Sequence, residues 1–299
     1  MHRGRRHAGI IAAVTERERE PEPEPEPDGR GPHLRAYLGV RLERSSSDVG
    51  RGALLISQRC RTRAGNLSLG AVATMTDVAA LRRANEVHPS PLVTSHLSLR
   101  IPGPLDDGLF YADSTVVRAG RARVISAVRV TDERDRVVGL GSVSSDALMG
   151  QGTSHQRARG PEEDDDFYVG RAGSAPDNGV PIDDFLALEP GGEGEGRVLF
   201  RMPFHEILRN VNGVLHGGAA TLLIEQAARQ VATAADPGTE TVVDAIEVHF
   251  LAPGLTGPFL ASVRPLSGGS SIVAEVEASD LGNGGRPVAL GLVSLRRGA

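Results

Sequence analysis

The hydrophobic pattern of the chain is organised around one stretch that begins at Gly217 and Gly218. Apart from Glu225 and Gln226, the positions that follow are apolar or small until Arg229. A run that is apolar on every face predicts a helix enclosed by other structure. Two glycines ahead of it indicate a loop that tightens into the helix start, where the first amides lack partners. Such a start can hold an anion or a polarised carbonyl oxygen.

Stretches rich in β-forming residues follow this helix. Apolar and polar residues alternate within 245–250 and within 273–277, which is typical of half-buried strands. The expected strands of the second half cover 241–251, 259–265, 271–278 and 288–295, and those of the first half cover 92–101, 110–117, 123–131 and 137–144. One helix followed by a meander of strands predicts an antiparallel sheet wrapped around a helix, an α+β fold.

The two halves of the sequence resemble each other. Leu67 stands 148 positions before Leu215, and Asp77 stands 148 positions before Glu225. Further along, Ile101-Pro102-Gly103 precedes Ala252-Pro253-Gly254 by 151 positions, so the spacing drifts by only three residues. We infer the duplication of one unit of about 115 residues, an ordinary size for a domain.

Two polar stretches flank the first unit. Residues 1–32 contain an alternating Glu/Pro tract, where repelling charges and missing amide donors predict a disordered tail. Residues 150–180 are polar and glycine-containing, as expected of a mobile linker. The expected order is therefore a tail (1–32), a first unit (33–149), a linker (150–180) and a second unit (181–299).

Composition narrows the classes of function. The formal net charge is −5, which argues against a nucleic-acid binder with a basic surface. Cys60 is the only cysteine, so no disulfide framework or cysteine zinc site is expected, and the cytoplasm is the expected location. No apolar run approaches the length of a membrane-spanning helix. The nine histidines show no metal-ligand spacing, so we expect neither metal nor cofactor.

The residues around the second helix resemble the PaaI-type acyl-CoA thioesterases of the hotdog fold. The signature of that family is an Asn, a His-Gly-Gly at the start of the central helix, and a carboxylate nine residues after the His. The matching residues are Asn210, His216, Gly217, Gly218 and Glu225. The resemblance covers most of residues 34–148 and 182–297. It implies hydrolysis of an acyl-CoA thioester and, with the duplication, a double hotdog in which one chain replaces the family's dimer.

Distances along the predicted helix decide which carboxylate can act with the glycine loop. Gly217 and Glu225 lie eight residues apart, hence about 12 Å apart on one helix. A reacting carbonyl must lie within roughly 3 Å of both the oxyanion donor and the base or nucleophile. The carboxylate must therefore come from a partner helix that runs antiparallel, where Asp77 has the matching position. We predict one competent site with Asp77, and Glu225 is the second choice.

Roles follow from this arrangement and from the resemblance. The amides of Gly217 and Gly218 would polarise the thioester oxygen. Asp77 would act as a base on water or as a nucleophile, and both mechanisms stay open. Asn210 would orient the water or the thioester, and His216 would shape the loop.

The opposite site is expected to be degenerate. There Glu225 would meet a loop in which Thr62, Ser68 and Leu69 replace the Asn, the His and the first Gly. Because one loop has changed in this way, a non-catalytic acyl-CoA-binding or regulatory hotdog protein remains the alternative function.

A turn in the first unit is the expected contact for coenzyme A. Members of the family tend to carry an Arg/Gly-Arg turn that meets the phosphates of CoA, and here Arg118, Gly120 and Arg121 match it. Guanidinium groups suit phosphate geometry. The counterpart in the second unit, residues 267–270, has no arginine.

The expected partner is an acyl-CoA substrate, without nucleic acid or membrane, and a homodimer of double hotdogs is left open. The acyl group cannot be deduced, because its expected lining permits aliphatic and aryl groups alike. That lining consists of Met75, Leu81, Leu222 and Leu223.

Overall fold

The computed structural model describes residues 33–43, 48–105, 107–148, 179–194, 196–236, 241–268 and 271–297. The tail expected over residues 1–32 lies outside the described residues. The same holds for the expected linker, apart from residues 179 and 180.

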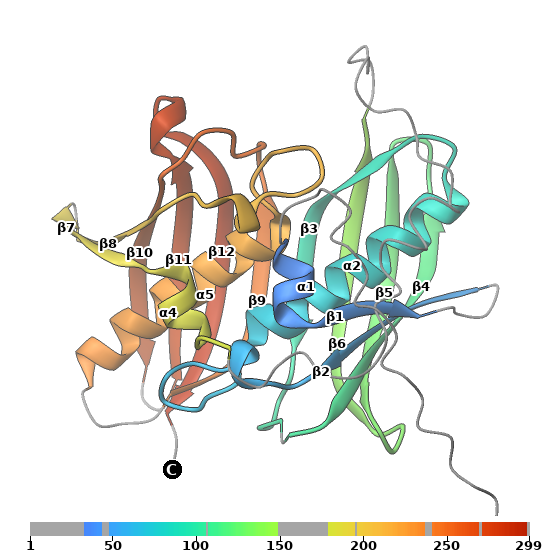
Figure 1. The fold of residues 1–299 in the computed structure, drawn as a ribbon, viewed down its shortest axis with the longest axis horizontal. Coiled ribbons are helices and arrows are strands. Elements are labelled where there is room, and N and C mark those ends of the chain that lie inside the picture. The colour runs from blue at the N-terminus through green and yellow to red at the C-terminus, as the bar shows by residue number, and fades with distance from the viewer. Residues whose placement is uncertain are drawn as a thin grey trace, which may run out of the picture. The chain divides into compact units, whose positions relative to one another are not determined.

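The described strands form one antiparallel sheet in the order β1-β2-β4-β5-β6-β3-β9-β12-β11-β10-β8-β7 (Figure 1). The strands of the first half are β1 (Val40–Glu43), β2 (Val49–Leu55), β3 (Leu92–Arg100), β4 (Leu109–Ala119), β5 (Arg123–Asp132) and β6 (Val137–Ala147). Those of the second half are β7 (Glu189–Gly194), β8 (Arg197–Met202), β9 (Thr241–Phe250), β10 (Phe259–Gly268), β11 (Ser271–Asp280) and β12 (Arg286–Arg297). The pairing of β3 with β9 joins the halves.

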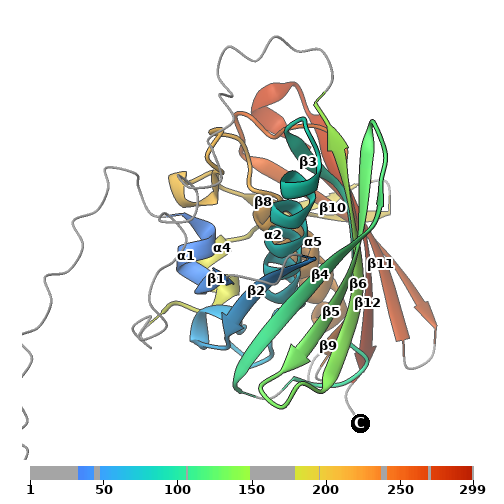
Figure 2. The same ribbon diagram turned by 90° about the vertical axis from the view of Figure 1, so that its right-hand side faces the viewer.

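Two long helices, α2 (Leu69–Val87) and α5 (Gly217–Ala235), lie on one face of the sheet, and Figure 2 shows both on the same side. Two short helices, α1 (Leu34–Leu38) and α4 (Ile182–Leu186), lie farther from the sheet on that side. Short 3₁₀ turns η1 (Gln58–Cys60), η2 (Glu206–Leu208) and η3 (Leu281–Asn283) complete the elements. None of the helices in these ranges has both the length and the apolar character that a membrane crossing needs.

The eight expected strands are confirmed as β3 to β6 and β9 to β12. Four further strands, β1, β2, β7 and β8, were not expected from the sequence. In β2 glycines occupy positions that face α2, because α2 lies directly against them. The alternation of apolar and polar side chains that would indicate a strand is therefore missing. A Cβ at Gly50 would be 2.7 Å from the carbonyl oxygen of Ala79, and one at Gly52 would be 3.2 Å from the Ala79 Cβ. β7 is exposed throughout and rich in glycine and glutamate, so it lacks the buried apolar positions that would indicate a strand.

The halves repeat each other in detail. Each runs through a short helix, two strands, a 3₁₀ turn, a long helix and four strands, and the second half has the additional turn η3 between β11 and β12. The loop ahead of each long helix closes with an antiparallel bridge, between Arg61 and Leu67 in one half and between Arg209 and Leu215 in the other. These bridges are 148 positions apart, so the sequence repeat is also a structural one.

The long helices run antiparallel and close together. Gly70 of α2 faces Leu222 and Glu225, whereas Gly218 of α5 faces Thr74. A Cβ at Gly218 would lie only 2.4 Å from the Thr74 Oγ1, and one at Gly70 would lie 2.9 Å from the Leu222 Cδ2. Glycine at the second position of each helix therefore allows the close approach.

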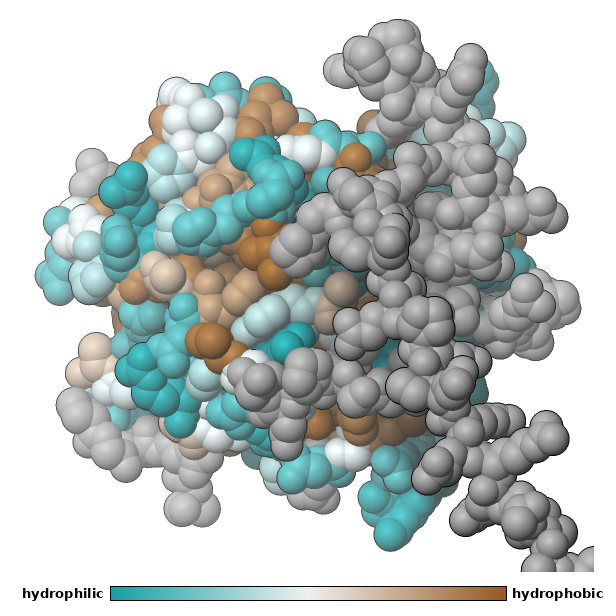
Figure 3. Space-filling model, in the orientation of Figure 1, coloured by the Kyte–Doolittle hydropathy of each residue, from teal (hydrophilic) through white to brown (hydrophobic). Residues whose placement is uncertain are grey.

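The core lies between the helices and the sheet and continues across both halves. On the face that carries α1 and α4, apolar surface is visible in the middle of the left-hand half and is bordered by hydrophilic residues (Figure 3). Both short helices bury two hydrophobic side chains each, Leu34 and Leu38 in α1 and Ile182 and Leu186 in α4. These side chains join the main core, with α1 against α2 and η1 and with α4 against η1.

Candidate functional site

Asp77 of α2 lies against the first residue of α5. A Cβ built at Gly217 would be 3.5 Å from the Asp77 Oδ2 and 3.5 Å from the ring of Phe250. The other carboxylate oxygen, Oδ1, accepts a hydrogen bond of 2.6 Å from the Thr94 hydroxyl. A carboxylate of the first half and a helix start of the second half therefore meet, as the distance argument requires.

Thr94 reaches Asp77 because β3 is irregular. The pairing of β3 with β6 shifts register between Thr94 and His96. In a regular strand, residues 94 and 97 would point to opposite faces. The bulge places Thr94 on the helix side together with the buried Leu97, an example of a bulge re-aiming a side chain at a site.

The environment of Asp77 changes its acidity. Burial raises the pKa of the Asp77 carboxyl to about 6, opposed by the Thr94 hydrogen bond and by the charge of Arg35 in α1. Above pH 6 the group is mostly ionised and can accept a proton. A pKa close to the working pH suits a general base.

His216 caps the start of α5. Its Nδ1 accepts a hydrogen bond of 2.9 Å from the Gly218 amide. Burial, together with the charges of Arg35 and His33, lowers the pKa of His216 to about 3. The imidazole is therefore neutral at ordinary pH and accepts the Gly218 bond at the start of α5. The loop-shaping role that the resemblance implies for it stays a prediction.

The amides at the start of α5 are not equivalent. The Gly218 amide already donates to His216. Within the described residues no hydrogen bond is found from the Gly217 amide, as expected for the first residue of a helix. Of the two expected donors, the Gly218 amide is thus bonded within the loop, and the Gly217 amide, which adjoins Asp77, is free. That these amides polarise a thioester stays a prediction.

Asn210 holds the turn that precedes the helix. Its Oδ1 accepts from the Asn212 amide at 2.9 Å and from the Val214 amide at 3.3 Å, and the Gly213 amide donates to its carbonyl oxygen at 2.9 Å. The side-chain oxygen is thus committed to the loop. A role in orienting water or thioester stays a prediction for the side-chain nitrogen.

The opposite helix start has a different occupant. The side chain of Glu225 is fully buried and accepts hydrogen bonds from the Ser68 hydroxyl at 2.5 Å, the Leu69 amide at 2.9 Å and the Gly70 amide at 2.7 Å. The first amides of α2 therefore bind a carboxylate of the protein itself.

Arg229 completes this cluster. Its Nε donates to Glu225 at 2.9 Å, and its two terminal nitrogens donate to the carbonyl oxygens of Thr241 at 3.0 Å and Leu67 at 2.8 Å. Both charged side chains are buried, and each is neutralised by the other. The arrangement leaves the Glu225 carboxylate no free face toward a substrate.

The arginine turn lies at the far end of α2. Arg118 and Arg121 are exposed, and the Gly120 amide donates to the Arg123 carbonyl oxygen at 2.8 Å within the turn between β4 and β5. The His88 Nε2 lies 3.2 Å from the Arg121 carbonyl oxygen. A surface hollow there is lined by Val87, His88, Pro89, Ser90, Ala119, Gly120 and Arg121.

The expected acyl lining is largely enclosed. Met75, Leu222 and Leu223 are fully buried in the main core. Leu81 is half-buried and packs with Ala84, Leu92 and Val124 in a separate cluster.

Comparisons with known proteins identify the family of this chain. The sequence model of the thioesterase superfamily matches residues 212–285, the part of the chain that contains the Gly217 helix start. A protein of Saccharolobus solfataricus named as a candidate esterase, SSO2140, is 31% identical over 97 residues, which are 32% of this chain and 69% of that protein. The chain belongs to the thioesterase superfamily.

Solved structures share its fold. The tesB protein MAP1729c of Mycobacterium avium subspecies paratuberculosis superposes with a TM-score of 0.61 at 16% identity, over 88% of this chain and 98% of that one. A hot dog fold protein of Alicyclobacillus acidocaldarius superposes with a TM-score of 0.56 at 15% identity, over 86% of this chain and 96% of that one. These likenesses show that this member of the thioesterase superfamily has the hotdog fold.

Proposed function

We propose that this chain hydrolyses acyl-CoA thioesters at one composite site, in which Asp77 of the first half acts beside the free Gly217 amide of the second half. The observation that carries the proposal is the placement of the Asp77 Oδ2 against Gly217 from an antiparallel helix. Membership of the thioesterase superfamily supports the reaction type. We interpret the two halves as two hotdog units of the PaaI type, fused into a double hotdog.

The chemistry follows from the two groups. The Gly217 amide and the positive end of the α5 dipole polarise the thioester carbonyl and stabilise the oxyanion that develops on its oxygen. As a base, Asp77 takes a proton from water while the water oxygen bonds to the carbonyl carbon. The carbon–sulfur bond then breaks, and the proton passes to the departing thiolate. This yields a carboxylic acid and CoA.

A nucleophilic route uses the same geometry. The Asp77 carboxylate attacks the carbonyl carbon directly, CoA leaves, and water hydrolyses the resulting mixed anhydride. A single turnover in ¹⁸O-water can reveal this nucleophilic route. In the nucleophilic route, attack of water on the Asp77 carbonyl would leave one ¹⁸O atom in the Asp77 side chain.

The CoA end of the substrate is assigned to the arginine turn. Val87 ends α2 ten residues after Asp77, which is about 15 Å along the helix. The pantetheine arm likewise separates the thioester of CoA from its nucleotide phosphates. Arg118 and Arg121 are exposed at that end and can pair with phosphate. The single buried thiol of Cys60 is compatible with a cytoplasmic location, which we also propose.

The test is CoA release from a panel of acyl-CoAs by the wild-type protein, Asp77→Ala and Glu225→Ala. Each rate is normalised to the folded fraction measured by circular dichroism. We expect turnover of at least one acyl-CoA by the wild type, loss in Asp77→Ala and retention in folded Glu225→Ala. Tight acyl-CoA binding without turnover by the wild type would instead indicate the regulatory protein. Loss of turnover only in Glu225→Ala would contradict the assignment of Asp77.

A further inference from the structure

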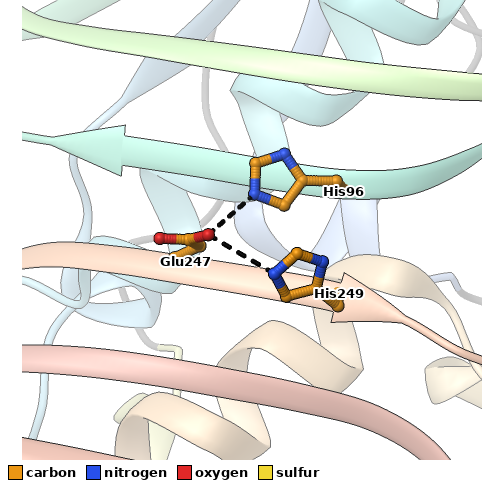
Figure 4. Close-up of side chains that lie close together, drawn as sticks. All are labelled: His96, Glu247 and His249. Atoms are coloured by element: carbon orange, nitrogen blue, oxygen red, sulfur yellow. Dashed lines mark hydrogen bonds and ion pairs between the residues drawn. The ribbon is translucent and has the colours of Figure 1, made fainter.

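Three potential metal ligands meet on the face of the sheet opposite the helices. His96 of β3 and Glu247 and His249 of β9 converge there, and Figure 4 shows the three side chains pointing toward one another across the two strands. Their neighbours Leu97 and Val248 are buried on the helix side, so strand alternation places the three polar side chains on the outer face. The cluster is therefore separate from the Asp77 site.

Two of the three distances between ligand atoms match those around a tetrahedral ion. The His96 Nε2 and the His249 Nε2 lie 3.2 Å and 3.4 Å from the same oxygen of Glu247, its Oε1, and all three ligand atoms lie within 4.8 Å of one another. Two atoms that are each 2.0–2.1 Å from a tetrahedral zinc ion are about 3.3 Å apart. The observed spacing is thus close to that of two ligands on one zinc ion.

We propose that His96, Glu247 and His249 form a binding site for a divalent transition-metal ion, with Zn²⁺ as the preferred ion. Two imidazole nitrogens and one carboxylate oxygen are borderline donors that suit zinc better than Mg²⁺ or Ca²⁺. Three protein ligands leave a fourth position open, and the side chain of His249 is 50% exposed, so that position faces solvent and takes water.

The position of the site defines its role. His96 is paired directly with His249 in the β3–β9 ladder, and this ladder joins the two halves of the sheet. An ion held there cross-links the halves at their seam. Because it binds the folded arrangement and not the separated strands, it stabilises the folded chain.

Spacing along the sequence does not reveal this set, because His96 lies 151 positions from Glu247. The expectation of no metal site rested on ligand spacing within single segments. Glu247 and His249 alone, two apart on one strand, are a common surface pair.

The test uses the full-length protein freed of metal by a chelator and then titrated with ZnCl₂ against a chromophoric competitor. We expect one high-affinity Zn²⁺ per chain, a higher unfolding midpoint with Zn²⁺, and visible bands of tetrahedral cobalt when Co²⁺ is used. His96→Ala and His249→Ala should each weaken binding more than about tenfold and remove the rise in midpoint. His205→Ala, which removes an exposed histidine elsewhere, should behave as the wild type.

Two results would overturn the proposal. The first is Zn²⁺ binding that is equal in the wild type and in the His96→Ala/His249→Ala double variant, because the ion would then be held by other histidines. The second is the absence of tight binding in a wild-type protein that is folded by circular dichroism. All readouts are binding and unfolding measurements, so they do not depend on thioester hydrolysis.

Discussion

The two helix starts of this protein have the same backbone setting but opposite occupants. At α5, Asp77 stops short of the helix start and leaves the Gly217 amide free. At α2, Glu225 is one methylene longer and binds the Leu69 and Gly70 amides itself. A helix start attracts anions wherever it occurs. We infer that the reach of the facing carboxylate decides whether a helix start is left open for a substrate or is closed by the protein itself.

The neighbours of each carboxylate reinforce the difference. Arg229 neutralises Glu225, whereas the matching position in the first half, four residues after Asp77, is Leu81. Asp77 accepts its hydrogen bond from the neutral Thr94 hydroxyl, and burial raises its pKa to about 6. Glu225 thus contributes to stability. Burial of ionised Asp77 costs free energy and favours proton transfer by this group, as expected of the base that we propose.

The largest expected effect is on stability, at the closed helix start. Glu225→Gln removes the charge that neutralises the buried Arg229, so we expect a loss of about 3–5 kcal/mol in the free energy of unfolding. Chemical denaturation measures it. The rate of hydrolysis per folded molecule should stay within about twofold of the wild-type rate, because a structural role of Glu225 leaves the reacting groups unchanged. A variant with wild-type stability would show that the cluster does not stabilise the fold.

The next effect separates the two glycines of the open site. A Cβ at Gly217 meets Asp77 and Phe250 at ordinary contact distance, whereas one at Gly218 would overlap Thr74 at 2.4 Å. Gly217→Ala should therefore fold normally but fill the space for the thioester oxygen, lowering kcat/KM by about 10²–10³. Gly218→Ala should chiefly destabilise the fold, by about 1–3 kcal/mol. The same loss of activity and stability in both variants would contradict the different roles of the two positions.

The free energy of unfolding should depend on pH through Asp77. Because burial raises the folded-state pKa of Asp77 to about 6, its contribution to stability is full below about pH 3.8 and is lost as the pH rises through 6. Asp77→Asn removes this loss. Relative to the wild type, the variant should gain up to about 3 kcal/mol in unfolding free energy between pH 3.5 and 7.5. Urea midpoints at the two pH values test this, and a difference independent of pH would be the contrary result.

The smallest effect belongs to the arginine turn. Exposed ion pairs contribute about 0.2–1 kcal/mol each, so Arg118→Ala/Arg121→Ala should raise KM for acyl-CoA about two- to thirtyfold with kcat unchanged. The same acyl group on a short pantetheine thioester, which lacks the nucleotide, is the matched control and should show no change. Equal effects on both substrates would remove the turn from the CoA site.

Much of the fold followed from patterns in the sequence, and the rest depended on contacts between distant segments. The eight-residue separation of Gly217 and Glu225 predicted a carboxylate from the facing helix, and the structure has Asp77 beside Gly217. Its choice over Glu225 as the acting group stays a prediction. The bonds between Glu225, Ser68 and Arg229 could not be deduced, because they depend on how closely the helices approach. The bulge that turns Thr94 toward Asp77 cannot be recognised from the order of polar residues in β3.

In this chain the start of α5 is open to a ligand, as we propose, and the start of α2 is closed by Glu225. Isothermal titration of the wild-type protein with a non-hydrolysable thioether analogue of a turned-over acyl-CoA tests this difference directly. We expect one analogue bound per chain, with binding weakened in Gly217→Ala and unchanged in folded Leu69→Ala. Two analogues per chain, or one whose binding is weakened by Leu69→Ala rather than by Gly217→Ala, would contradict it.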